Sequence, residues 1–343
     1  MAISYLSGGR IQGIKSDTKP TNVPIQSLFE ETDTGKFYKY MYANGFASAS
    51  WIEMGTGGVI TQNTTLNSSL VTGGYDGSAV IDSTETFSGG VWSASHDLGG
   101  NRGLHAGGGH STSAMVVGGD DHNWTALSST EKLVSGAWGS ADAIPAARYY
   151  TCGGGSPTDF LLCQGNAGNS APSYNRTKSW TYDGSTWANA STVGWECYGC
   201  NMGGNATSAV CFGGNTGNST DDYAVWNGSS WGTVGSMNEP RYIHGGDGTS
   251  TNAIAYQGAQ GTSTARCSET FNGSSWTDIG YSSLSSYARY GAMACGTGSV
   301  AVCGMGKANG VYLNSTETWD GSAWATSGNP QVTREYSAGG YAV

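Results

Sequence analysis

The sequence predicts an all-β chain that closes into a ring of six four-stranded sheets, a six-bladed β-propeller. Three observations lead to this fold class. An aromatic or aliphatic residue followed five positions later by tryptophan occurs six times. Successive tryptophans of this motif lie 44 to 49 residues apart, a period typical of propeller blades. The two ends of the repeat region are complementary, because the first repeat lacks a strand that the last residues can supply.

Each copy of the motif predicts a tight hairpin. The four residues between the paired positions are SGGV, VSGA, DGST, NGSS, NGSS and DGSA. Asn-Gly and Asp-Gly favour the positive φ angles of a short turn, and apolar residues flank the turn on both sides. The pairs are Phe87 and Trp92, Leu133 and Trp138, Tyr182 and Trp187, Trp226 and Trp231, Phe271 and Trp276, and Trp319 and Trp324.

Four strand-like segments recur within each period. In residues 289–326 they are RYGAMACG, SVAVCGM, NSTETWDG and AWATS. The first segments are rich in glycine, as expected where inner strands converge on an axis and leave room only for small side chains. The second segment ends in Gly-Gly or in a variant of it: Gly73-Gly74, Gly118-Gly119, Gln164-Gly165, Gly213-Gly214, Gln257-Gly258 and Cys303-Gly304.

The ends of the repeat region fit a closed ring. The first unit has only three segments, NSSLVTGG, DSTETFSGG and VWSAS. The last segment, TREYSAGGYAV, is a first strand without a second, and it carries Arg334 at the repeat position. We therefore expect this segment to complete blade one, which would hide an open sheet edge. An incomplete seventh blade is the alternative.

Residues 1–58 do not share the repeat and predict a separate module ahead of the propeller at 59–343. Residues 1–27 are polar, and we expect an extended leader there. Alternation in residues 36–40 and in residues 50–53 predicts two strands of a small β-hairpin.

The charge balance excludes several classes of partner. The formal net charge is -10, and only 12% of residues are charged. Nucleic-acid binding draws on clustered Lys and Arg, so no nucleic-acid partner is expected. The first residues contain no apolar segment typical of a signal peptide, and no apolar run approaches the ~18 residues needed to span a bilayer. We expect synthesis in a cytoplasm, no export by that route and no membrane insertion.

Over about residues 59–343 the repeat resembles the kelch repeat, through the Gly-Gly after its second strand and the tryptophan of its fourth. The resemblance implies a propeller with four-stranded blades. The third strand departs from kelch, because STETF, STEKL, CSETF and STETW stand where a Tyr-Asp-containing segment is usual.

Two recurrent residue types predict packing and not chemistry. The six tryptophans are expected to fill the wedges between adjacent blades, because an indole buries a large apolar area. A catalytic carboxylate pair would be singular, whereas a glutamate recurs in the third strand of four blades. We expect these glutamates to bond neighbouring backbone or an arginine; they are Glu85, Glu131, Glu269 and Glu317.

A recurrent arginine precedes the first strand in five of six blades, and Cys197 lies near the sixth position. The repeat predicts a broken ring of these side chains at one mouth of the channel. One interpretation is a set of hydrogen bonds and ion pairs to the glutamates. The other is recognition of an anionic or sugar ligand, since arginine presents a planar fork of donors. The candidate ligand-binding residues are Arg102, Arg148, Arg241, Arg289 and Arg334.

Nothing in the sequence predicts catalysis. The five histidines are expected at the surface or in turns, and the eight cysteines are expected to be buried free thiols. Cys197 and Cys200 form one CxxC without a second pair, so no metal and no cofactor is expected. Kelch propellers include copper radical oxidases with two tyrosines, two histidines and a Cys–Tyr link, and that arrangement is not reproduced here. Such an enzyme is the least favoured alternative; we expect a protein that is not an enzyme.

The functional hint lies in residues 31–38, Glu-Thr-Asp-Thr-Gly-Lys-Phe-Tyr, with Trp51 downstream. They resemble a segment of bacteriophage virion proteins in which E-T-D-T-G-K-x-Y and a later tryptophan form a small β module of tail and fibre proteins. The resemblance implies a virion structural protein, in a tail, a fibre or a capsid-surface appendage. The implied anchor residues are Phe29, Asp33, Gly35, Phe37, Tyr38 and Trp51.

This interpretation sets the expected partners. Residues 1–58 would attach to other virion structural proteins. The propeller would offer a surface to a host glycan, a host protein or a neighbouring subunit, and homo-oligomers remain open. A carbohydrate-binding propeller lectin is the second interpretation.

Overall fold

The computed structural model describes five strands within residues 4–56, and then residues 69–121, 123–167, 176–260, 263–282 and 289–340. The chain divides into two compact units, Met1–Thr64 and Thr65–Val343. The boundary expected at residue 58 falls among residues outside the described part. Throughout the described residues the regular elements are strands, and no helix there is long and apolar enough to cross a membrane.

The N-terminal unit contains a five-stranded sheet in the order β1-β2-β3-β4-β5. Its strands are Ser4–Tyr5, Arg10–Gly13, Leu28–Glu31, Lys36–Tyr42 and Ala49–Thr56. The predicted hairpin is confirmed, because β4 pairs with β5 in antiparallel register. Within the segment expected to be extended, residues 1–27, β1 pairs with β2, and β2 pairs in parallel with β3; these pairings were not predicted.

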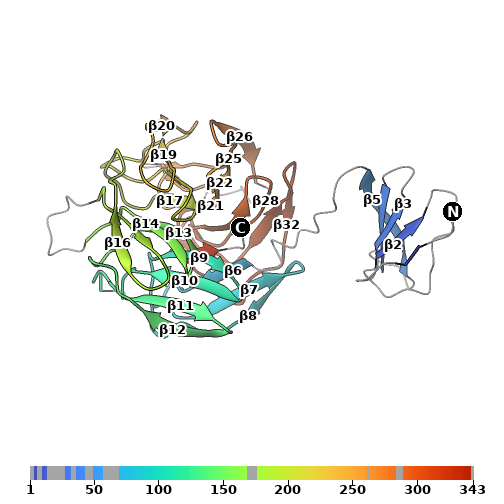
Figure 1. Ribbon diagram of the computed structural model, residues 1–343, viewed down its shortest axis with the longest axis horizontal. Coiled ribbons are helices and arrows are strands. Elements are labelled where there is room, and N and C mark those ends of the chain that lie inside the picture. Colours follow the sequence, from blue (N-terminus) through green and yellow to red (C-terminus); the bar gives the residue numbers. More distant parts are fainter. Residues whose placement is uncertain are drawn as a thin grey trace. The chain divides into compact units, whose positions relative to one another are not determined.

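The second unit is a six-bladed β-propeller, as predicted (Figure 1). Each blade is an antiparallel four-stranded sheet, written here from the axis outward. Blade one is β33 (Ala338–Gly340), β6 (Ser69–Thr72), β7 (Thr84–Ser88) and β8 (Val91–Ala94); blade two is β9 (Ala106–His110), β10 (Ser113–Val117), β11 (Thr130–Val134) and β12 (Ala137–Ala141); blade three is β13 (Cys152–Ser156), β14 (Asp159–Cys163), β15 (Ser179–Tyr182) and β16 (Trp187–Ala190).

The other three blades follow the same plan. Blade four is β17 (Asn201–Gly204), β18 (Ala209–Phe212), β19 (Asp222–Trp226) and β20 (Gly235–Ser236); blade five is β21 (Gly245–Thr249), β22 (Asn252–Tyr256), β25 (Cys267–Phe271) and β26 (Trp276–Tyr281); blade six is β27 (Met293–Thr297), β28 (Val300–Gly304), β31 (Thr316–Trp319) and β32 (Trp324–Thr326). Two short hairpins lie between second and third strands: β23 (Ala259–Gln260) with β24 (Ser263–Thr264), and β29 (Lys307–Ala308) with β30 (Val311–Tyr312).

The C-terminal strand closes the ring. β33 pairs antiparallel with β6, with Ala338 opposite Thr72 and Gly340 opposite Leu70. Figure 1 shows this end of the chain near the axis, inside the ring. The exchange joins the first and last parts of the propeller by main-chain hydrogen bonds, so neither β33 nor β6 is left as an unpaired edge.

All six predicted hairpins form with the predicted partners opposite each other. The rings of Phe87 and Trp92, for example, have centroids 5.1 Å apart. Each tryptophan also packs against the preceding blade. Trp92 lies against Met293 and Val302 of blade six, and its Nε1–H donates to Thr316 Oγ1 at 3.2 Å. The indoles therefore fill the wedges between blades, as predicted.

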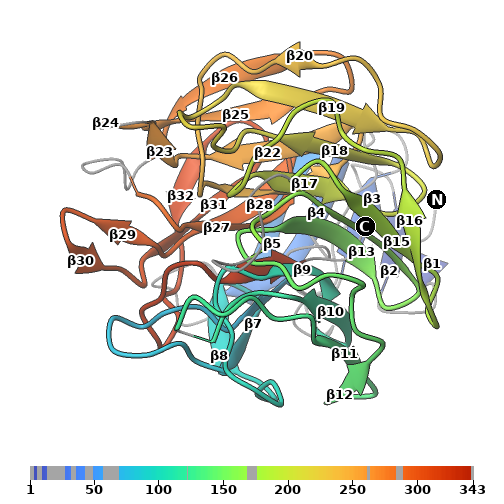
Figure 2. The same ribbon diagram turned by 90° about the vertical axis from the view of Figure 1, so that its left-hand side faces the viewer.

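The inner strands contact one another all the way around the axis. Figure 1 and Figure 2 show three of them, β9, β13 and β17, near the middle of the ring. A Cβ on Gly108 would lie 2.6 Å from the carbonyl oxygen of Gly155, and one on Gly154 would lie 2.6 Å from that of Gly204. Glycine is therefore required because neighbouring backbones meet.

One detail of the repeat was wrong. In blade six the pair equivalent to Gly-Gly is Met305-Gly306, with φ values of 56° and 80°, and not Cys303-Gly304. Gln164 and Gly165 show the same left-handed pair, with φ values of 58° and 89°. Cys303 belongs instead to strand β28, whose apolar residues gave no clue to where it ends.

Candidate functional site

The recurrent arginines lie inside the blades, with their side chains only 0–3% exposed. Each precedes the first strand of its blade and reaches the third strand of the same blade. Arg334 pairs with Glu85 at 2.6 Å, Arg102 with Glu131 at 2.6 Å, and Arg241 with Glu269 at 2.5 Å. All three glutamates also accept from the backbone N–H three residues ahead of the arginine: Glu85 from Gln331 at 2.7 Å, Glu131 from Gly99 at 2.6 Å and Glu269 from Asn238 at 2.8 Å.

We call this buried arginine–glutamate pair, which links the residue before the first strand to the third strand, the arginine–glutamate staple. The other three blades have different contacts at the same two positions. In blade three the glutamate position holds Trp180, and the Arg148 guanidinium lies over that ring, 5.3 Å from its centroid. In blade six Arg289 donates to the Ser315 carbonyl at 2.9 Å, while Glu317 accepts from the Tyr256 hydroxyl at 2.8 Å. Blade four has Cys197 and Ala224 at the two positions. The arginines are buried and form their contacts within blades. This favours the first interpretation, internal hydrogen bonds and ion pairs, over recognition of a ligand.

A closed ring of six backbone hydrogen bonds surrounds the channel mouth beside these arginines. Each bond joins the second residue after the arginine position to its equivalent in the next blade, for example Tyr150 N to Leu104 O at 2.8 Å. All six residues have left-handed backbones, with φ between 44° and 64°. They are Leu104, Tyr150, Gly199, Ile243, Gly291 and Tyr336. Four of the six are not glycine, so the ring holds side chains in a conformation that L-residues seldom adopt.

The position directly after each arginine decides where this mouth is open. Four blades carry tyrosine there: Tyr149, Tyr198, Tyr242 and Tyr290. Blade two carries Gly103 and blade one carries Glu335. Each residue forms a β-bridge with the residue after the Gly-Gly equivalent, so Gly103 faces Asp120 and Glu335 faces Tyr75. The missing tyrosine side chain at Gly103 leaves space between blades one and two.

A cavity of about 280 Å³ occupies that space. Blade one lines it with Tyr75, Val80, Glu335 and Tyr336, and blade two with Gly103, Leu104, Asp120 and Trp124. A second and smaller cavity, of about 80 Å³, follows the channel axis among the first strands.

Two buried carboxyl groups face the larger cavity. Glu335 is 3% exposed, and its Oε2 accepts no hydrogen bond within the described residues. Burial raises the pKa of Glu335 from 4.5 to about 7, and the charge of Lys307 and a hydrogen bond with Tyr312 oppose this rise only in part. Asp120 is 4% exposed and accepts from the Trp124 backbone N–H at 3.2 Å. An oxygen buried without a partner is costly, and a ligand that donates a hydrogen bond relieves that cost.

An aromatic wall completes the cavity. Trp124 is 51% exposed, an unusual fraction for an indole, and its backbone φ is 58°. Its ring stacks on Tyr150 with centroids 6.3 Å apart and meets Tyr149 at 6.0 Å. Tyr150 in turn meets Tyr336 at 5.9 Å. The site combines buried acceptors, an exposed aromatic face and no cationic side chain among its lining residues, which suits a neutral ligand rich in hydroxyl groups.

The structure places four of the six implied anchor residues in strands of the N-terminal sheet. Phe29 lies in β3 opposite Tyr38 of β4. Phe37 also lies in β4, and Trp51 lies in β5 opposite Tyr40. Asp33 and Gly35 lie outside the described residues.

The prediction that the histidines lie at the surface was wrong for two of them. His105 is buried and shares a hydrogen bond of 2.9 Å with the Thr72 hydroxyl across the boundary of blades one and two. His244 is buried against the ring of Phe212. Burial, together with the nearby charge of Arg241, lowers the pKa of His244 from 6.5 to about 3. Both rings are therefore neutral parts of the core.

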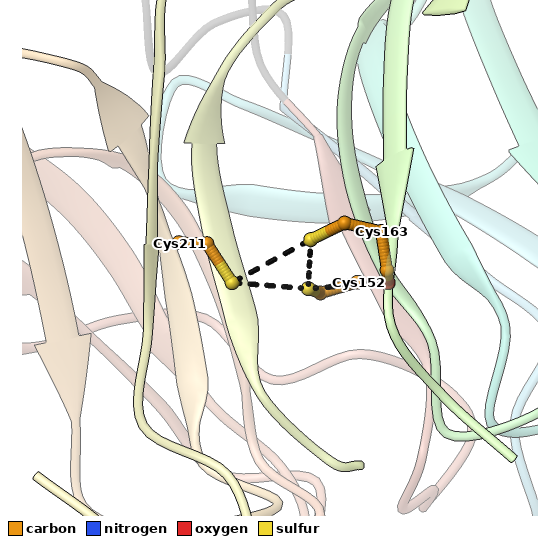
Figure 3. Close-up of side chains that lie close together, drawn as sticks. All are labelled: Cys152, Cys163 and Cys211. Atoms are coloured by element: carbon orange, nitrogen blue, oxygen red, sulfur yellow. Dashed lines mark hydrogen bonds between the residues drawn. The ribbon is translucent and has the colours of Figure 1, made fainter. Parts of the chain in front are cut away.

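The cysteines are buried free thiols, as predicted, but four of them gather at one place. Figure 3 shows Cys152 and Cys163 of blade three facing Cys211 of blade four. Their sulfur atoms lie within 4.8 Å of one another, and Cys200 Sγ lies 2.7 Å from Cys152 Sγ. Cys197, the other half of the CxxC, instead donates to Gln164 Oε1 at 2.8 Å.

Comparison with protein-family models and with curated proteins finds no match for this chain.

Proposed function

We propose that this chain is a bacteriophage virion structural protein whose kelch-like propeller binds a host-surface glycan at the mouth between blades one and two. Glycan binding is supported by the cavity of about 280 Å³, where Glu335 has an oxygen without a hydrogen-bond partner and Trp124 is exposed. Carboxylates accept hydrogen bonds from sugar hydroxyls, and aromatic rings pack on the apolar faces of sugars.

The six blades supply an internal comparison for this site. The equivalent position is tyrosine in blades three to six, and the side chain is absent only at Gly103. A Cβ on Gly103 would meet Asp120 Oδ1 at 3.6 Å and Val80 at 3.8 Å, which are ordinary contacts. The glycine is therefore not required for packing. It leaves one blade junction open, and a single site per propeller follows.

The Gly103→Tyr variant tests the site in the full-length chain. It restores the residue of four other blades and should fill the cavity without unfolding the ring. Trp124→Ala should cost about 0.5–1.5 kcal/mol of binding, or roughly 2- to 10-fold in Kd. Tyr281→Ala, at an aromatic residue 69% exposed on β26, is the matched control and should leave binding unchanged.

The measurement is a glycan array with all four proteins. Selective binding by the native chain that Gly103→Tyr abolishes and Tyr281→Ala preserves supports the site. Binding that Gly103→Tyr leaves intact places the glycan elsewhere, and the assignment fails.

The virion half of the proposal rests on the resemblance at residues 31–38 and on the division of the chain into two compact units. We propose that residues 1–58 attach the protein to the particle. A phage that encodes the chain without these residues should yield particles that lack the protein, while the propeller accumulates folded in the lysate. Normal incorporation of the truncated chain would refute the anchor.

A free carbohydrate-binding lectin is the second candidate, and the same cavity supports it. Lectin propellers with repeated sites bind several sugars at once, whereas this geometry favours one. A stoichiometry of one glycan per chain by titration calorimetry, together with presence in purified particles, would favour the virion protein.

A further inference from the structure

A cluster of cysteines lies at the boundary of blades three and four, away from the cavity between blades one and two. It consists of four cysteines at positions that every blade boundary possesses. The earlier blade contributes two of these positions: the first residue of its first strand and the last residue of its second strand. The later blade contributes the other two: the residue just before its first strand and the next-to-last residue of its second strand. At this boundary the four are Cys152, Cys163, Cys200 and Cys211.

The other five boundaries show what the positions need for packing alone. Between blades two and three they hold Ala106, Val117, Thr151 and Leu162, and between blades five and six Gly245, Tyr256, Ala292 and Cys303. These positions accept glycine, aliphatic side chains, threonine, tyrosine and a single cysteine, so packing there does not require sulfur. Half of the chain's eight cysteines therefore meet at one boundary out of six, although no packing rule calls for sulfur.

The sulfur atoms are close enough to share one ion. Cys152 Sγ lies 3.3 Å from Cys163 Sγ, 2.7 Å from Cys200 Sγ and 3.5 Å from Cys211 Sγ, and Cys163 Sγ lies 3.6 Å from Cys211 Sγ. A tetrahedral zinc–thiolate site with Zn–S distances of about 2.3 Å places its sulfurs about 3.8 Å apart. The sulfurs of Cys152, Cys163 and Cys211 all lie within 4.8 Å of one another and need moves of a few tenths of an ångström to reach that geometry. Cys200 Sγ stands outside this group of three, against Cys152 Sγ, and has to move by about 1 Å or more to become the fourth ligand.

The surroundings suit a structural site. All four side chains are buried, between 0% and 6% exposed. Three of them lie in strands β13, β14 and β18, and Cys200 lies directly before β17, so an ion would tie blade three to blade four. Blade four is also the blade that lacks both the recurrent arginine and the recurrent glutamate, with Cys197 and Ala224 in their places. Cys152 and Cys200 line the channel cavity of about 80 Å³, which gives an ion a route to the cluster.

We propose that Cys152, Cys163, Cys200 and Cys211 bind one zinc ion and so cross-link blades three and four. Zinc displaces the four thiol protons: one Zn²⁺ and four S–H groups give a tetrathiolate zinc centre and four H⁺, with no change of oxidation state. From the sequence we expected no metal, because Cys197 and Cys200 form a single CxxC without a second pair. The four ligands proposed here stand 11, 37 and 11 residues apart and match no zinc motif. This inference does not depend on the proposed glycan binding or on the virion assignment.

The test compares two valine variants in the full-length chain. Cys211→Val removes a ligand and inserts the residue that blade two carries at this position, Val116. Cys303→Val makes the same change at the equivalent position of blade six, where the thiol is equally buried. The proteins are purified under reducing conditions, and their zinc content is measured by mass spectrometry of the metal.

We expect about one zinc per chain in the native protein and in Cys303→Val, and less than a tenth of that in Cys211→Val. Replacement of zinc by Co²⁺ should give thiolate-to-cobalt charge-transfer bands and the visible bands of a tetrahedral site, and Cys211→Val should lose them. Circular dichroism confirms that each variant is folded.

Three results would overturn the proposal. One is a native chain that holds no zinc and takes up no Co²⁺ while all eight thiols are free. Another is a mass lower by two hydrogens with Cys152 joined to Cys200, which would make the pair a disulfide. The last is equal metal loss in both valine variants.

Discussion

The Arg334→Met substitution tests how the ring is held shut. Arg334 precedes the C-terminal strand, and its side chain enters blade one. It donates to the carbonyl oxygens of Gly73 at 3.0 Å and Ser83 at 2.9 Å, and it pairs with Glu85 at 2.6 Å. The side chains of Arg334 and Glu85 are 0% and 2% exposed. Methionine keeps most of the apolar length and removes every donor.

The magnitude follows from these contacts. Removal of one partner of a buried ion pair costs about 3–5 kcal/mol, because the remaining charge stays buried. Glu85 still accepts hydrogen bonds from the backbone N–H groups of Gln331 and Val332, so its carboxylate stays partly stabilised. The two carbonyl oxygens lose their donor in addition. We therefore expect a loss of ~3–5 kcal/mol in the free energy of unfolding, which corresponds to a Tm lower by roughly 6–15 °C.

Arg148→Met is the matched control. Arg148 occupies the same position in blade three, where the partner is the ring of Trp180 and the one hydrogen bond described is 3.4 Å long, to the Gly165 carbonyl. Burial lowers the pKa of Arg148. Its loss should cost at most about 1 kcal/mol.

Urea unfolding, followed by tryptophan fluorescence and circular dichroism, measures both variants. The reasoning fails if Arg334→Met and Arg148→Met lose the same stability within about 0.5 kcal/mol. It also fails if Arg334→Met is as stable as the native protein.

Three further predictions concern closure and protonation. Deletion of residues 334–343 removes β33, the Arg334 staple and the Tyr336 link of the backbone ring, and should abolish the cooperative unfolding transition; a native-like transition would contradict the closure argument. The pKa of buried His244 is lowered to about 3, so the unfolded chain takes up its proton first and stability should fall by ~1.4 kcal/mol per pH unit as the pH drops below about 6. His244→Gln should remove the part of this slope that His244 contributes, while buried His105, whose pKa burial also lowers, should keep its own part. The pKa of Glu335 is raised to about 7, so its carboxylate form grows as the pH rises from about 6 to about 8. Glycan affinity should rise over the same range, and Glu335→Gln should remove the dependence; a flat profile in the native protein would argue against Glu335 as the acceptor.

The repeat made the propeller predictable from sequence. Six hairpins with a fixed spacing, such as that of Phe87 and Trp92, need only local turn chemistry and a recurring neighbour. The missing first strand of blade one and the unpaired last segment then left one simple way to close the ring. Prediction was weaker where no repeat exists. In the N-terminal sheet, β2 pairs in parallel with β3, which lies 15 or more residues later in the chain. No turn motif in the sequence predicts this pairing.

The arginines show how far the site could be predicted. The sequence correctly paired the repeated arginine with the repeated glutamate as one of two options. It also placed the arginines in a ring at a channel mouth, whereas their side chains reach the third strand inside each blade. Direction of a side chain after a loop depends on the local backbone. Here the second residue after each arginine position has a left-handed backbone, which turns the chain toward the axis.

The sequence by itself determined the number of blades, the partners of the six tryptophan hairpins and the closing strand, because each depends on short-range patterns repeated along the chain. Only the tertiary structure decided that Gly103 and Glu335 open one mouth, that His105 and His244 are core residues, and that Cys152, Cys163, Cys200 and Cys211 meet. These residues lie in different blades, and the distance between two blades is set by packing around the axis, which no local spacing encodes.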